Sequence, residues 1–226
     1  LAEQSVDMIM ATREFCDNQS IVLDDKLFLA GWSEGGAATV ATQKLIERAY
    51  KDEITITANA PLAGIFAIQF YCRIGISFAP FVFTDWGQEM DELLWAIYAI
   101  NKYTDDNPLD TDEIFKFEVK NQMDVLKDRP TSVPNKCIQY FIKDRSKLLS
   151  KFAQNDLSDG WTPIAPIFVH HGTDDENVFY PFNTETTVNN LNKLGGDVTL
   201  IKYEGHDHYS LDKLYLLNMI EEFEQY

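Results

Sequence analysis

Cysteine is scarce in this 226-residue sequence, and positive charge is outnumbered. The three cysteines, Cys16, Cys72 and Cys137, have none of the spacings typical of a zinc site, and their odd number excludes a framework in which every cysteine is paired. A single bridge between Cys72 and Cys137 stays open. Only 19 Lys and Arg residues oppose 36 Asp and Glu residues, which gives a formal net charge of −17. Because such a chain repels phosphate groups, we expect neither a nucleic-acid partner nor binding to an anionic membrane surface.

The sequence also lacks a hydrophobic run long enough to cross a membrane. The longest apolar stretches lie around residues 65–70 and 74–83, and Gln69 and Pro80 interrupt them well short of the roughly 20 residues that a spanning helix needs. Hydrophobic residues nevertheless make up 45% of the chain and aromatic residues 13%. That content is enough for one sizeable core, so the composition indicates a folded globular protein without a transmembrane segment.

Short apolar segments alternate with segments of helical periodicity along most of the chain. The apolar segments have the length and residue types of buried strands, and we predict strands at 27–30, 54–59, 166–172 and 198–203. Apolar residues at helical spacing predict helices at 5–17, 35–50, 183–194 and 211–226. Strands that alternate with helices form parallel sheets covered on both faces, so the expected fold class is α/β with a mostly parallel sheet.

A long excursion interrupts this alternation between the second and third predicted strands. It is rich in aromatic residues and carries two helical patterns, at 85–103 and 111–127. We therefore expect residues 1–64 and 161–226 to form the core, and residues 65–160 to form a helical cap, or lid, inserted into it. The alternative is that both helices belong to a larger core.

The segment GWSEGG at 31–36 lies where the first predicted strand should meet its helix. A serine hydroxyl is a weak nucleophile, so a catalytic serine needs a fixed, exposed position beside a base and beside donors for the oxyanion. A sharp strand-to-helix turn provides this position for Ser33, and Gly31 and Gly35 are expected to remove side chains that would collide across the turn. The backbone N–H of Glu34 is then a candidate oxyanion donor at the start of the helix.

Four segments are similar to those of a known family. They are GWSEGG at 31–36, ITITANAPLAG at 54–64, PIFVHHGTDDENV at 166–178 and YEGHDHYSL at 203–211. Together they resemble the α/β-hydrolase superfamily, particularly its serine esterases, its secreted lipases and the prolyl-oligopeptidase-like hydrolases. The resemblance covers residues 25–64 and 163–226. It implies an α/β-hydrolase sheet, an activity that needs no cofactor or metal, and a catalytic triad in the chain order Ser, Asp, His. It also favours a secreted or periplasmic location.

The resemblance implies an acid after the third strand and a base after the fourth. In the HGxxD pattern that begins at His171 the acid is the fifth residue, Asp175, with Asp174 as the alternative. A buried carboxylate at that position would fix the imidazole tautomer and stabilise the imidazolium that forms during attack. The base is either His208, which follows an Asp as in many members of the family, or His206, which directly follows a Gly.

The chain departs from the family in what precedes the candidate nucleophile. Only about thirty residues precede Ser33, whereas related hydrolases have several strands and an oxyanion loop there. We therefore expect a C-terminal portion that carries part of the sheet and one of two oxyanion donors. We also expect a missing N-terminal segment, or a second chain, to complete the sheet, because an uncovered strand edge favours aggregation.

The predicted activity is hydrolysis of a small-molecule or lipid ester through an acyl-enzyme, with Ser33 as nucleophile, His208 as base and Asp175 as the acid. The aromatic excursion favours an apolar acyl or aryl group. A peptidase or an acyltransferase that uses the same residues stays open. Two alternatives come from other classes, namely a metal-dependent hydrolase and a non-catalytic binding module. The metal site would draw on neighbouring strand-end residues: His170, His171, Asp174, Asp175, His206 and His208.

Overall fold

The computed structural model describes residues 1–70, 73, 88–110 and 147–226. The chain divides into two compact units, of which the first combines Leu1–Ala67 with Leu157–Tyr226 and the second is Ile68–Asp156. Cys72, Cys137 and the helical pattern predicted at 111–127 lie outside the described residues. The division into a core and a lid at 65–160 stays a prediction.

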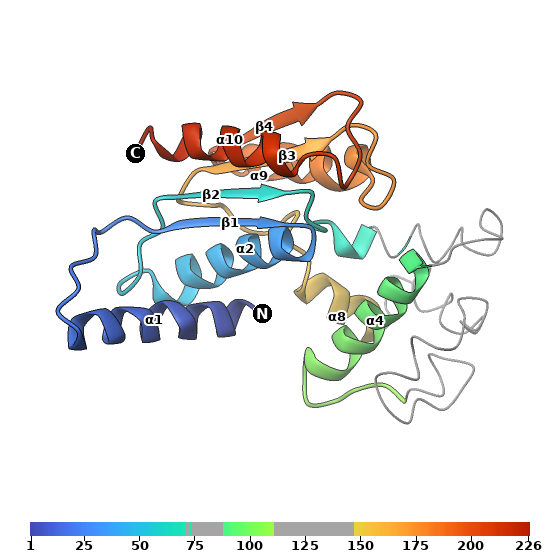
Figure 1. Cartoon of the computed structure of the whole chain (residues 1–226). Helices are drawn as coiled ribbons and strands as arrows, with labels where there is room; N and C mark the ends of the chain where they lie inside the picture. The colour runs from blue at the N-terminus through green and yellow to red at the C-terminus, as the bar shows by residue number, and fades with distance from the viewer. Residues whose placement is uncertain (71–72, 74–87, 111–146) are drawn as a thin grey trace. The chain divides into compact units, whose positions relative to one another are not determined.

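The first unit is built on a parallel sheet in the strand order β1-β2-β3-β4. Its strands are β1 (Phe28–Trp32), β2 (Ala58–Leu62), β3 (Ile167–Gly172) and β4 (Val198–Tyr203). Each neighbouring pair is parallel, and Figure 1 shows the four arrows running in one direction, so the carboxyl ends of the strands share one edge of the sheet. The predicted α/β class with a parallel sheet is confirmed. Further strands beyond β1 stay a prediction.

The second strand begins later than its β-branched residues indicate. Residues 54–57 lead up to the sheet, and the strand itself, Ala58–Leu62, is buried throughout. Pro61 lies inside it, although the predicted strand ended at residue 59, before this proline. The N–H groups of Asn59 and Ala63 donate to carbonyls on the β3 side at 3.0 and 2.9 Å, and Pro61 between them has no N–H to donate. A buried central strand can therefore contain this proline at the cost of one interruption in the ladder to β3.

Helices cover both faces of the sheet. On one face, α2 (Glu34–Leu45) and α9 (Thr186–Lys193) pack against apolar side chains of β3 and β4. On the other face, α10 (Asp212–Phe223) packs against β2 and β4 through Tyr215. Since successive residues of a strand point to opposite faces, neighbouring residues of β3 face different helices. This alternation separates two histidines at the end of β3, as described below.

The remaining elements of the first unit extend these layers. They are α1 (Ala2–Asn18), which packs on α2, and two short π-helical turns, η1 (Ile46–Tyr50) after α2 and η3 (Pro181–Glu185) before α9. Together with α2, α9 and α10, they account for the helices predicted at 5–17, 35–50, 183–194 and 211–226. The layers and their order along the chain are shown in Figure 1.

The second unit contains two helices within its described residues, α4 (Gln88–Tyr103) and α8 (Lys147–Gln154). The first matches the helical pattern predicted at 85–103. Lys151 is buried in α8 and forms an ion pair with Asp105, in the segment that follows α4. In the part of the chain that the structure describes, no helix is long and apolar enough to cross a bilayer.

Candidate active site

Ser33 lies at the sharp turn between β1 and α2. Its backbone has φ 56° and ψ −121°, a strained combination for a residue other than glycine. Two hydrogen bonds hold the turn, because the Ser33 N–H donates to the Leu62 carbonyl at 2.9 Å and the Ala37 N–H donates to the Ser33 carbonyl at 3.1 Å. The serine side chain is only half-buried, so a hydroxyl on a fixed backbone stays accessible.

The glycines of the turn differ in what they do. A Cβ on Gly31 would lie 2.4 Å from the Gly35 carbonyl oxygen, and a Cβ on Gly36 would lie 2.7 Å from the Leu62 carbonyl oxygen. Either contact would force the backbone apart. A Cβ on Gly35, in contrast, would meet nothing within 4 Å. The expectation that Gly35 prevents a collision is therefore wrong for its own side chain, and Gly36 is the second glycine that the close packing requires.

His208 joins the serine to a carboxylate. Its Nε2 lies 3.0 Å from Ser33 Oγ, and its Nδ1 lies 2.7 Å from Asp175 Oδ2. An ionised carboxylate only accepts hydrogen bonds, so the proton of the neutral imidazole must be on Nδ1. Nε2 is then left to accept the hydrogen bond from the Ser33 hydroxyl. The three predicted side chains are thus brought into one hydrogen-bonded line, although they are far apart in the sequence.

The two alternative residues lie elsewhere. His206 Nδ1 is 3.3 Å from Ser210 Oγ, within its own loop. The structure describes both His206 and Ser33, and it shows no hydrogen bond between them. Asp174 is exposed, and its side chain accepts a hydrogen bond from the Thr173 hydroxyl at 3.1 Å. Of each pair left open by the sequence, the structure brings His208 and Asp175 together with Ser33.

The Asp175 side chain is fully buried, and four N–H groups surround its carboxylate. Oδ1 accepts from the N–H groups of Asn177 and Val178 at 2.9 and 2.8 Å, and Oδ2 accepts from His208 Nδ1 at 2.7 Å, while His171 Nε2 lies 3.1 Å from Oδ2. Burial raises the pKa of Asp175, but the hydrogen bonds from His171, His208 and Val178 outweigh it and leave the pKa well below its ordinary value of 3.8. The carboxylate is therefore ionised at neutral pH.

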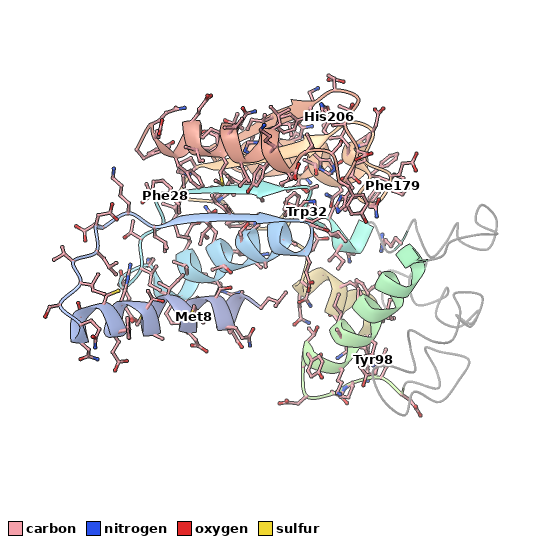
Figure 2. The ribbon with its side chains drawn as sticks, viewed as in Figure 1. Met8, Phe28, Trp32, Tyr98, Phe179 and His206 are labelled. Carbon is pink, nitrogen blue, oxygen red and sulfur yellow. The ribbon has the colours of Figure 1, made fainter. Side chains whose placement is uncertain are left out.

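Trp32, which sequence reasoning did not assign to the site, contacts the base directly. Its indole N–H donates to the His208 main-chain carbonyl at 3.1 Å, and the two rings lie 5.3 Å apart. Tyr209 meets the Trp32 ring edge-on at 5.8 Å. These two aromatic side chains are 46% and 65% exposed, so they present apolar surface beside the serine and the histidine. Figure 2 shows Trp32 at the carboxyl end of β1.

Gly172 brings the loops after β3 and β4 together. A Cβ at this position would lie 2.2 Å from the His206 carbonyl oxygen, so only glycine allows the approach. The same carbonyl accepts a hydrogen bond from the Asp174 N–H at 3.0 Å. The glycine of the HGxxD pattern therefore sets the distance between the loop that carries the acid and the loop that carries the base. In Figure 2, His206 marks the second of these loops.

Glu34 is the first residue of α2 and follows Ser33 directly. The first N–H groups of a helix have no partner inside the helix, and the Glu34 N–H has no hydrogen-bond acceptor among the residues that the structure describes. The helix dipole adds positive potential at this end. A second oxyanion donor is not identified within the described residues.

The six residues considered for a metal site do not gather in one cluster: His171 and His208 meet Asp175, and the other three lie apart from them. His170 points to the opposite face of the sheet from His171, where its ring nitrogens lie 2.8 Å from the Tyr203 hydroxyl and 2.9 Å from Glu222 Oε2. Within the described parts of the chain, no three His, Cys, Asp or Glu side chains are grouped so that they could hold a metal ion.

No protein-family model matches the sequence, and no curated protein matches it. Solved structures do resemble it. The rice cell wall degrading esterase LipA from Xanthomonas oryzae superposes with a TM-score of 0.77 at 18% identity, over 97% of this chain and 64% of LipA. A provisionally assigned hydrolase from Legionella pneumophila gives 0.77 at 20% identity, over 98% of this chain and 62% of its own. Candida antarctica lipase A gives a TM-score of 0.58 at 20% identity, over 92% of this chain and 50% of the lipase.

These likenesses identify the fold. A parallel sheet with helices on both faces, matched over nearly all of the chain, is the α/β-hydrolase fold that the four sequence segments predicted. The chain spans less than two thirds of the length of each of these structures.

Proposed function

We propose that this chain, which has the α/β-hydrolase fold, carries the catalytic centre of a serine hydrolase that cleaves carboxylic esters. One observation carries the proposal, namely the hydrogen-bonded line from Ser33 Oγ through His208 to the buried Asp175 carboxylate, with distances of 3.0 and 2.7 Å. Nucleophile, base and orienting acid are the three groups that acyl transfer by a serine requires.

The reaction follows from the tautomer of His208. Nε2 takes the proton of the Ser33 hydroxyl while Oγ attacks the ester carbonyl, and Asp175 stabilises the imidazolium that results. His208 then gives the proton to the leaving alcohol, which leaves an acyl-enzyme on Ser33. A water molecule, activated by the same nitrogen, hydrolyses it. The Glu34 N–H is the proposed donor to the carbonyl oxygen as it becomes negative.

The surroundings of the serine favour an ester with an apolar acyl or aryl group. Trp32 and Tyr209 present exposed aromatic surface next to Ser33 and His208. An apolar group placed there would be partly removed from water, which is favourable. Two of the similar structures are named an esterase and a lipase, which supports an ester as the substrate.

A fluorophosphonate probe tests the proposal, because it reacts covalently with serines that are activated by a neighbouring base. We expect one labelled peptide containing Ser33, and no labelling in Ser33→Ala. Ser20→Ala is the matched control, since Ser20 is also a serine at φ 56° but lies outside the site. The control should be labelled like the wild type. Absence of labelling, together with an esterase activity that a chelator abolishes, would contradict the proposal and favour a metal-dependent hydrolase.

A further inference from the structure

Two consecutive buried histidines lie near the carboxyl end of β3, and they point to different faces of the sheet. His170 and His171 are both 0% exposed, and their neighbouring positions in a strand direct them to opposite sides. His170 bonds to Tyr203 and to Glu222, which connects β3 to α10. His171 instead faces the loop that carries Asp175. The pair offers a natural comparison between a histidine that contacts the candidate triad and one that does not.

The hydrogen bonds of His171 have a defined direction. Its Nε2 lies 2.9 Å from the Val178 carbonyl oxygen and 3.1 Å from Asp175 Oδ2, and both of these atoms are acceptors. The single proton of a neutral ring must therefore be on Nε2, where it bonds to the Val178 carbonyl and lies against Asp175 Oδ2. Nδ1 lies 2.6 Å from Thr184 Oγ1, so it accepts the hydrogen bond of that hydroxyl.

Further buried groups fix the Thr184 hydroxyl. The amide nitrogen of Asn183 donates to Thr184 Oγ1 at 3.0 Å. The amide oxygen of Asn183 accepts from the N–H groups of Phe66 and Ala67 at 2.8 and 3.0 Å, which determines the orientation of the amide. Because Nδ1 of the neutral His171 ring carries no proton, the threonine hydroxyl, which accepts from Asn183, donates its own proton to His171. A chain of donors thus runs from the backbone at residues 66–67 to the Asp175 carboxylate.

We propose that His171 is a positioning residue, which holds the Asp175 carboxylate in the orientation that accepts the His208 Nδ1 proton. Thr184 keeps His171 in the Nε2–H tautomer, which carries its proton on the nitrogen that faces Asp175. This inference rests on the proposed function, because it assigns His171 a role through Asp175 rather than through contact with a substrate. Two imidazole N–H groups meet on one carboxylate oxygen, so removing one of them leaves Oδ2 with a single donor and leaves the carboxylate freer to rotate.

A purely structural role is the competing explanation, since His171 is buried and also meets the Tyr180 ring edge-on at 5.7 Å. The variants must therefore separate packing from hydrogen bonding. His171→Leu keeps the approximate volume of the side chain, makes it apolar and removes the donor. His171→Gln places an amide nitrogen near the position of Nε2 and keeps a donor. His170→Leu and His170→Gln make the same changes at an equally buried site outside the triad.

The steady-state kinetics of these variants give the first test, in the longest form in which the natural protein is made. We expect His171→Leu to lower kcat by about 10- to 100-fold with KM little changed, as for loss of a hydrogen bond to a charged group. His171→Gln should recover most of this loss. The His170 variants should lower the melting temperature and leave kcat within about threefold of the wild type. Equal losses of kcat at both positions, or no loss in His171→Leu, would overturn the proposal.

A second pair of variants applies if the His171 variants do not fold. Thr184→Val removes the hydroxyl that holds the tautomer, and Thr184→Ser restores it. We expect Thr184→Val to lower kcat by about tenfold and Thr184→Ser to recover it. Nuclear magnetic resonance of isotope-labelled histidine in the wild type reports the tautomer directly. The Nε2–H form of His171 is expected, and an Nδ1–H form would overturn the proposal.

The outcomes distinguish this proposal from the proposed function. If the wild type is not labelled at Ser33 by a fluorophosphonate, both fall. If the wild type is labelled and His171→Leu is labelled equally fast, the serine hydrolase survives and the role of His171 falls. Slower labelling of His171→Leu, with normal labelling of His170→Leu, supports both.

Discussion

The turn that carries Ser33 and the loop that carries Asp175 are built on different physical principles. The turn is held by close backbone contact, because Gly31 and Gly36 leave no room for a Cβ against neighbouring carbonyls. The loop is held by hydrogen bonds that converge on one buried carboxylate. The serine stays half-exposed, whereas Asp175 is almost fully buried.

This difference follows from what each residue would have to do. A nucleophile must reach a substrate from solvent, so its position is set by rigid backbone beneath it. An orienting acid must keep its charge without contacting water or substrate, so it needs enough donors to offset its desolvation. Changes of volume should therefore damage the turn, and changes of charge or of hydrogen bonding should damage the loop.

The largest effect is expected from a change of charge in the loop. Asp175→Asn keeps the volume of the side chain but places an amide N–H₂, which is a donor, among the four N–H groups that surround the carboxylate. It also favours the wrong tautomer of His208. We expect kcat/KM for a nitrophenyl ester to fall on the order of 10³- to 10⁴-fold. Asp174→Asn is the control, because the exposed Asp174 side chain is outside the line, and its kcat/KM should stay within about threefold of the wild type. A loss of similar size in both variants would mean that the loop, and not the buried carboxylate, matters.

A change of volume in the turn should have the next largest effect. In Gly31→Ala the new Cβ would lie 2.4 Å from the Gly35 carbonyl oxygen, so the backbone under Ser33 must move. We expect the rate of fluorophosphonate labelling to fall by about 100-fold. We also expect the free energy of unfolding to fall by about 1–3 kcal/mol.

Gly35→Ala is the matched control within the same turn, since its Cβ would meet nothing within 4 Å. Labelling should be unchanged, and the helical position favours alanine over glycine by up to about 1 kcal/mol. Chemical denaturation measures the two free energies. A Gly35→Ala variant as inactive as Gly31→Ala would show that Gly35 is needed for a reason other than steric contact.

The same contrast explains what the sequence could predict. A volume constraint leaves a local signature, and the glycines around Ser33, between an apolar segment and a helix, predicted the turn. The alternation of apolar and helical segments predicted the α/β fold in the same local way. Hydrogen bonds between distant residues leave none. The pattern at 171–178 and 205–208 left two acids and two histidines open, and the choice between them depends on loops that only the packing of Gly172 against His206 brings together. Pro61 within β2 was missed because a proline inside a strand is permitted only by the pairing around it.

A smaller effect is expected where the two regions meet. Trp32 belongs to the turn and donates its indole N–H to the backbone of His208. Trp32→Phe keeps the aromatic ring and removes one neutral hydrogen bond, which is about 1 kcal/mol, or about fivefold in kcat/KM. Trp161→Phe is the matched control, because the Trp161 indole N–H donates to the Leu157 carbonyl at 2.9 Å in the same way. Stability should fall in both variants, and kcat/KM only in Trp32→Phe. Equal kinetic losses would contradict a link between the turn and the base.

The smallest effect is expected from a moderate fall in pH, because the Asp175 carboxylate should keep its charge. The pKa of Asp175 lies below its ordinary value of 3.8, because its hydrogen bonds outweigh its burial. A carboxyl group of this kind stabilises the fold fully above its unfolded-state pKa and loses that contribution as the pH falls through its folded-state pKa. The difference in unfolding free energy between the wild type and Asp175→Asn should therefore stay constant from pH 8 to about pH 5 and shrink only below about pH 4. Denaturation curves at several pH values measure this difference, with Asp174→Asn as the reference. If the difference disappears near pH 6, burial exceeds the hydrogen bonds, and the loop does not keep its charge in the way that its four donors imply.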